Sequence, residues 1–155
     1  MPTRKPETLP KTGKIVCFDV GSKTVGVATS DIMRVIASPH KTIQRKKWSE
    51  DKKIILQLIK ENNIVAAIVG LPLHMNGDIS KSSQSAENFA LLVEQECEIP
   101  VLMWDERLST SAAESSMFEM RTGRQKRMSK KDAKQAVDSV AASLILQSVL
   151  PVLAK

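Results

Sequence analysis

An aspartate stands inside an apolar segment near the N-terminus, where a β-strand would normally exclude charge. Asp19 lies within residues 14–20, and the turn-like residues 21–24 separate this segment from a second apolar run at residues 25–28. Removing an unpaired carboxylate from water is very costly. A carboxyl group in this position must therefore be paired, protonated or bound to a cation, which makes Asp19 the first candidate for chemistry.

Acidic residues occupy two further positions that an apolar pattern would not predict. Asp105 and Glu106 follow the apolar run at residues 100–104, and Asp138 borders the apolar stripe of the last predicted helix. An acid at a strand end is often only a turn or capping residue, and Asp138 alone could be an exposed helix residue. Small residues follow Asp138, however, and would allow its helix to approach a sheet closely. Together with Asp19, these acids from distant segments predict a metal site.

Positive charge is concentrated in two segments of a chain whose formal net charge is +6. Residues 121–134 carry seven basic residues against one acid, and residues 41–53 carry six against two. Such clusters are typical of surfaces that bind phosphate backbones, although a single charged run is more often a solvated face. We expect the first segment to bind nucleic acid, because it leads into the helix of Asp138, whereas both interpretations stay open for the second. The nucleic-acid-binding candidates in the first segment are Arg124, Lys126, Arg127 and Lys130.

Length and composition indicate one domain. A chain of 155 residues with 42% hydrophobic content can bury one substantial core but hardly two. We expect a flexible, proline-containing tail at residues 1–13 and a single domain over residues 14–155. No apolar run approaches the roughly 20 residues that span a bilayer, and the N-terminus lacks the apolar region of a secretion signal, so a cytoplasmic location is expected. Two cysteines are too few for a disulfide framework and have no metal-ligand spacing.

Hydrophobic periodicity predicts an α/β fold in which a run of strands is followed by alternating helices and strands. Short β-branched segments separated by turns predict antiparallel hairpins, and a helix followed by a buried strand predicts a parallel crossover. The predicted strands are residues 15–20, 25–29, 35–38, 64–69 and 101–104. The predicted helices are residues 49–62, 86–97 and 111–122, and a last helix that starts near Ser129. This order gives a mixed sheet with helices on its faces.

Four segments, spread in order over nearly the whole chain, resemble the YqgF family, also called RuvX, of the ribonuclease H-like superfamily. They are residues 19–31 (DVGSKTVGVATSD), 69–77 (VGLPLHMNG), 105–110 (DERLST) and 138–147 (DSVAASLILQ). The chain departs from the usual pattern at Thr24, where the family usually has arginine, at Asn76, where it has aspartate, and at Ser109, where it has threonine. None of these departures removes an acid of the predicted site.

The resemblance implies a ribonuclease H-like fold, with helices on both faces of a five-stranded mixed sheet whose central strand is the first. It also implies hydrolysis of phosphodiester bonds, with a role in processing the 5′ end of the precursor of 16S ribosomal RNA, and a Holliday junction resolvase acting on DNA is the alternative. Nucleases of this type use two divalent ions roughly 3.5–4 Å apart. Mg²⁺ or Mn²⁺ fits that task, because both accept oxygen ligands.

The predicted catalytic residues are Asp19, Glu106 and Asp138. We expect Asp19 to bind both ions, and Glu106 and Asp138 to hold one each. Asp105 competes with Glu106 as the metal ligand, because strand alternation points neighbouring side chains to opposite faces. One of these two acids is expected to orient Arg107, which is also a candidate for nucleic-acid binding.

Roles outside the acidic site stay open at the level of sequence. Lys23 could contact phosphate or face solvent, and Trp48 could stack on a base or pack in the core. His74, in the predicted loop at residues 70–77, could act as a base, yet a metal-activated water needs no histidine.

Two other functional classes compete with a nuclease. A non-catalytic module that binds nucleic acid would keep the basic surface with an inactive site. A phosphotransferase of the actin or sugar-kinase kind also begins with an Asp-x-Gly turn, but it normally binds nucleotide between two such domains, for which 155 residues are too few. The expected partner is therefore nucleic acid, either precursor rRNA or branched DNA. Cleavage of a symmetric junction would favour a homodimer.

Overall fold

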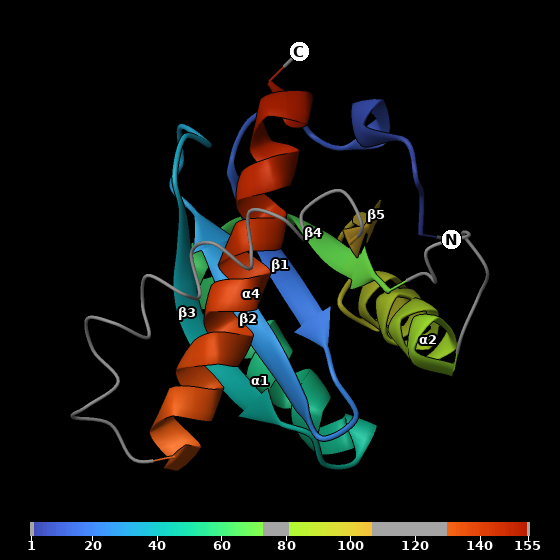
Figure 1. The fold of residues 1–155 in the computed structure, drawn as a ribbon. Helices are drawn as coiled ribbons and strands as arrows, with labels where there is room; N and C mark the ends of the chain where they lie inside the picture. The colour runs from blue at the N-terminus through green and yellow to red at the C-terminus, as the bar shows by residue number, and fades with distance from the viewer. Residues whose placement is uncertain (1, 73–80, 107–129, 155) are drawn as a thin grey trace.

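The computed structural model describes residues 2–72, 81–106 and 130–154, which form a five-stranded mixed sheet with helices on both faces (Figure 1). The strand order is β3-β2-β1-β4-β5, so the first strand is central, as predicted. The strands are β1 (Lys14–Val20), β2 (Thr24–Ser30), β3 (Ala37–Gln44), β4 (Ile64–Leu71) and β5 (Val101–Asp105). The pairs β1–β2 and β2–β3 are antiparallel, whereas β4 is parallel to both β1 and β5.

Helices cover the two faces unequally. The helices α1 (Trp48–Asn62) and α2 (Lys81–Glu96) pack on one face, which we call the α1/α2 face. The long helix α4 (Lys130–Leu153) crosses the opposite face, the α4 face, and runs in front of the sheet in Figure 1. No helix among the described residues is both long and apolar enough to cross a membrane.

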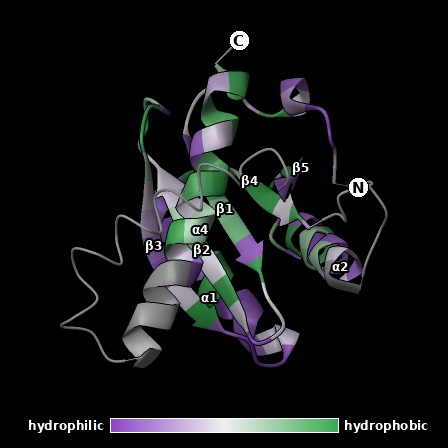
Figure 2. Ribbon diagram, viewed as in Figure 1, coloured by the Kyte–Doolittle hydropathy of each residue, from purple (hydrophilic) through white to green (hydrophobic). Residues whose placement is uncertain are grey.

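The central strand β1 is buried on both faces, which explains its nearly continuous apolar sequence. Val16 and Phe18 belong to the core on the α1/α2 face, whereas Ile15 and Cys17 belong to the core on the α4 face. Figure 2 shows the resulting hydrophobic colouring of β1 and β4 in the middle of the sheet. Strand alternation places the Asp19 side chain on the α4 face, where it is only partly buried.

The third strand lies later in the chain than predicted. The sequence predicts a strand at residues 35–38, but β3 starts at Ala37 and continues to Gln44 through a polar stretch. Asp31 accepts the backbone N–H groups of Val35 and Ile36 at 2.8 and 2.9 Å, which makes these two residues part of the turn. β3 is an edge strand with one exposed side, and its polar composition therefore hid it from a search for apolar runs.

The N-terminal residues, predicted to be a flexible tail, pack on the domain. Thr3 bridges to the outer edge of β5: its N–H donates to Val101 at 3.0 Å and its carbonyl accepts from Met103 at 2.7 Å. A short 3₁₀ helix, η1 (Pro6–Thr8), follows, and Leu9 is buried in the core of the α4 face. Polar and proline-rich composition does not report the few backbone hydrogen bonds that hold this segment against β5.

Some predicted features lie outside the described residues. They are the helix at residues 111–122, most of the basic segment at residues 121–134, the loop that contains His74, and Asn76 and Ser109. The remaining predicted helices and strands are present, with bounds that differ by a few residues.

Candidate active site

The site is built around Asp19, which has a glycine beside it on both neighbouring strands. Asp19 pairs directly with Gly26 of β2. On the other side, Phe18 pairs with Val69 of β4, and the next step of this parallel register brings Gly70 beside Asp19. Glycine weakens a strand and often marks a place where another group approaches the backbone closely. Both glycines have that role here.

Gly26 makes room for the backbone of α4. A Cβ atom at Gly26 would overlap the carbonyl group of Asp138, so the helix passes directly over this point of β2. The Asp138 side chain then reaches Thr24, whose hydroxyl donates a hydrogen bond to Oδ2 at 2.9 Å. Thr24 is one of the positions where the chain departs from the family pattern, and in this protein it orients one of the predicted acids.

Gly70 makes room for the side chain of Glu106. A Cβ atom at Gly70 would lie 2.6 Å from Oε1 and 3.0 Å from Cγ of Glu106. Glu106 follows β5 directly, and its carboxyl group shares a hydrogen bond with Asp19 across the space that Gly70 leaves. Two acids from distant segments, one on β1 and one directly after β5, are thus in contact.

The electrostatics of this carboxyl pair favour a shared proton. Burial and the charge of Asp19, together with the hydrogen bond that protonated Glu106 donates to Asp19 and the charge of Asp105, raise the pKa of Glu106 to about 8. Burial also raises the pKa of Asp19, with a further increase from the charge of Asp138, although the hydrogen bond with Glu106 opposes this shift. Two carboxyl groups in contact and largely shielded from water cannot both be ionised without a large cost in free energy. A cation at this point would relieve the repulsion.

The geometry distinguishes between Asp105 and Glu106. Asp105 pairs with Leu71, whose side chain lies in the core of the α1/α2 face, so alternation directs Asp105 to that face. Glu106 lies over Gly70, on the same side of the sheet as Asp19. Glu106 is therefore the acid that joins Asp19.

The three predicted ligands do not form one compact cluster. Within residues 2–72, 81–106 and 130–154, no three Asp, Glu, His or Cys side chains are close enough together to hold a metal ion. Asp19 and Glu106 are in contact, while Asp138 acts on Asp19 through its charge and is hydrogen-bonded to Thr24. The donor chemistry nevertheless suits Mg²⁺ or Mn²⁺, because all three groups are carboxyl groups and the Asp19–Glu106 pair shares a proton that a divalent ion could replace.

Only some of the predicted nucleic-acid-binding residues lie in the part of the chain that the structure describes. Lys23 is exposed in the turn between β1 and β2, and its carbonyl accepts the backbone N–H of Arg45 at 2.9 Å. Lys130 is the first residue of α4. Arg107, Arg124, Lys126 and Arg127 lie outside the described residues.

Three residues that shape the site were not predicted from the sequence: Gly26, Gly70 and Thr24. The signal for the two glycines was available, because an isolated glycine inside a strand pattern suggests close approach of another group. The identity of those groups was not, since it depends on which segments meet in the folded chain. Nothing in the local sequence indicates that Thr24 would bind Asp138.

The sequence is similar to one protein family and to curated relatives over most of its length. A family model described as RuvX, Holliday junction resolvase, matches residues 13–151. A protein of Paracoccus denitrificans is 40% identical over 144 residues, which cover 93% of this chain and 87% of that protein. A protein of Rhodobacter capsulatus is 41% identical over 146 residues, which cover 94% and 88%. Both relatives carry the name "Putative pre-16S rRNA nuclease".

Solved structures share the architecture at low sequence identity. Thermus thermophilus RuvC in complex with a Holliday junction has a TM-score of 0.54 and 13% identity, covering 86% of this chain and 91% of that one. The yeast mitochondrial Holliday junction resolvase has a TM-score of 0.53 and 13% identity, covering 94% and 80%. These likenesses concern the fold, and they confirm the predicted ribonuclease H-like architecture.

Proposed function

Since this chain belongs to the RuvX family, we propose that it is a divalent-metal-dependent nuclease whose substrate is the precursor of 16S ribosomal RNA. The named relatives support the substrate. The observation that carries the catalytic part is the contact between the carboxyl groups of Asp19 and Glu106, on the face of the sheet that α4 covers.

Asp19, Glu106 and Asp138 are the residues that would hold Mg²⁺ or Mn²⁺. When bound, such ions polarise the scissile phosphate and the attacking water. The chain itself supplies the arrangement that receives them. Gly70 keeps the Glu106 carboxyl group beside Asp19, and Thr24 holds Oδ2 of Asp138 in one orientation. Asp19 and Glu106 share a proton in the metal-free protein, and they would give it up to bind a cation.

Positive charge near the site supports binding of a polyanion. Lys23 is exposed in the turn that begins two residues after Asp19. The basic segment at residues 121–134 leads into α4, the helix that carries Asp138. Phosphate contacts of this kind provide affinity that depends on salt and little on sequence.

The substitution Asp19→Asn tests the catalytic proposal. It keeps the size of the side chain but removes the charge that a divalent ion needs, so cleavage should fall by at least about 100-fold while RNA binding persists. The assay uses an RNA that spans the 5′ end of 16S rRNA, with Mg²⁺ or Mn²⁺. Glu61→Gln is the matched control, because Glu61 is an exposed acid of α1. Equal cleavage rates for Asp19→Asn and the parent would reject the proposal.

A four-way DNA junction is the second candidate substrate. The description of the matching family and the fold shared with junction resolvases favour it. Parallel assays with the precursor RNA and with a junction of equal strand length would rank the two by cleavage rate. Faster cleavage of the junction would reverse our assignment of the substrate but keep the assignment of the acids.

A further inference from the structure

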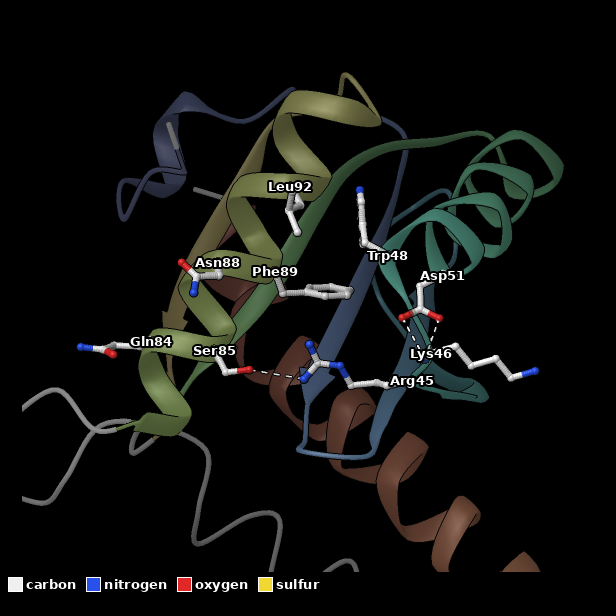
Figure 3. A pocket seen from close by; sticks show the side chains of 9 residues that line it. All are labelled: Arg45, Lys46, Trp48, Asp51, Gln84, Ser85, Asn88, Phe89 and Leu92. Atoms are coloured by element: carbon white, nitrogen blue, oxygen red, sulfur yellow. Dashed lines mark hydrogen bonds between the residues drawn. The ribbon is translucent and has the colours of Figure 1, made fainter.

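A polar cavity of about 340 Å³ lies outside the acidic site, between the end of β3, the start of α1 and the first half of α2 (Figure 3). Arg45 and Trp48 line it on one side, and Ser85, Asn88 and Phe89 line it on α2. Part of its lining comes from the basic segment at residues 41–53, for which the sequence left both a binding role and a solvated role open.

Arg45 connects this cavity to the turn that follows Asp19. Its backbone N–H donates to Lys23 at 2.9 Å, and its Nη1 donates to the carbonyl of Gly21 at 2.7 Å. Nη1 also donates to the hydroxyl of Ser85 at 3.3 Å, which ties the turn to α2. Figure 3 shows the guanidinium group reaching across toward α2. Its Nε and Nη2 donors have no partner among the described residues, and an anion in the cavity could accept hydrogen bonds from them.

The charge of the lining favours an anion. Asp51 is the acid in the wall, and both of its oxygens accept the backbone N–H of Lys46, at 3.1 and 3.2 Å. Arg45 and Lys46 leave the lining with a net positive charge. The side-chain amide of Asn88, an exposed residue, adds a neutral hydrogen-bond donor.

The aromatic residues of the cavity make contacts within the protein. The rings of Trp48 and Phe89 pack edge to face, with their centroids 6.0 Å apart. Trp48 also donates its Nε1–H to Glu96 at 2.8 Å. Phe89 is buried and also packs on Phe18. Recognition here therefore depends on charge and hydrogen bonds, the chemistry that binds a phosphate group.

We propose that this cavity binds a phosphodiester group of the substrate strand at a position away from the cleaved bond, with Arg45 and Asn88 as its principal contacts. The proposal rests on the proposed function in that the occupant is a nucleic acid strand. The path between the two sites crosses the turn at Gly21, Ser22 and Lys23, all of which are exposed. The strand thus passes from Asp19, on the α4 face, over the turn that joins β1 to β2 and on to the cavity on the α1/α2 face.

Variants of Asn88 test the proposal without touching the hydrogen bonds that Arg45 makes to the turn. Asn88→Asp places a negative charge at the mouth of the cavity, and Asn88→Lys places a positive one. The probes are fluorescent 15-nucleotide strands of uridine and of deoxythymidine, measured in EDTA so that no cleavage occurs. Gln95→Glu and Gln95→Lys are charge-matched controls at an exposed position of α2. Gln95 lies about two helical turns from Asn88 along α2, which is beyond the electrostatic screening length at 150 mM salt.

We expect Asn88→Asp to weaken binding of both strands by about threefold or more and Asn88→Lys to strengthen it similarly, with the salt slope changing by about one. The Gln95 variants should bind like the parent. Unchanged affinity in both Asn88 variants would overturn the proposal, and so would an effect on only one polymer, because both carry the phosphodiester. If Asp19→Asn abolishes cleavage while the Asn88 variants bind normally, the cavity is rejected and the nuclease stands. If Asp19→Asn cleaves like the parent while the Asn88 variants change binding as expected, the nuclease assignment is rejected and the cavity proposal stands.

Discussion

Gly70 lies beneath the carboxyl group of Glu106, so close that a methyl group in its place would be 2.6 Å from Oε1. The empty space at this glycine is what allows Glu106, beyond the end of β5, to reach Asp19 on β1 although β4 lies between them. On the other side of Asp19, Gly26 allows the backbone of α4 to pass over β2 with Asp138. Two glycines thus let two acids approach a third.

Gly70→Ala should separate the carboxyl pair with little damage to the fold. The new methyl group meets the flexible end of Glu106 rather than backbone, so the side chain can move away at a small cost in stability. We expect metal-dependent cleavage to fall about tenfold or more, while the midpoint of urea unfolding changes little. Cleavage rates and unfolding curves of the same preparation check this. Full activity with an alanine at position 70 would show that the contact between Glu106 and Asp19 is dispensable.

Thr24→Val should weaken metal binding by releasing Asp138. Valine has nearly the shape of threonine but cannot donate the 2.9 Å hydrogen bond to Oδ2. The lost hydrogen bond should change the free energy of unfolding by only about 1 kcal/mol. The Mn²⁺ concentration needed for half-maximal cleavage should rise about three- to tenfold, since an unrestrained ligand binds less well. Thr24→Ser, which keeps the hydroxyl group, is the control and should behave like the parent. Equal metal requirements in all three proteins would contradict this role.

The metal-free protein should lose stability as the pH rises, because of Glu106. Its pKa is about 8 in the folded protein and 4.5 ordinarily, so folding favours the protonated form. The resulting stabilisation is complete below about pH 4.5 and disappears as the pH rises through 8. Asp19, whose pKa is also raised, acts in the same direction.

Glu106→Gln isolates this contribution, because glutamine resembles the protonated acid at every pH. In EDTA, the variant should match the parent near pH 4 and exceed it in unfolding free energy by at least about 1 kcal/mol at pH 8. Urea unfolding at several pH values measures the difference between the two proteins. A difference that does not depend on pH would show that Glu106 is not held in its protonated form.

Much of the fold was readable from local pattern. The apolar runs of β1, β2, β4 and β5 and the helical spacing of α1 and α2 report burial directly, because side-chain periodicity follows the geometry of each element. The bounds of β3 and the contacts of the N-terminal segment could not be predicted in this way. Both are held by backbone hydrogen bonds that composition does not reveal.

The acids of the site were recognisable one by one, since a charged residue beside an apolar run is anomalous wherever it occurs. Their relationship was not recognisable. Whether Asp105 or Glu106 faces Asp19 depends on how β5 is aligned with β4, and this alignment is set by contacts between residues distant in the chain. The same holds for Thr24 with Asp138 and for Arg45 with Gly21. Residue types reveal which groups can take part in chemistry, but only the packed sheet and helices establish which of them meet, because long-range register is a property of the whole fold.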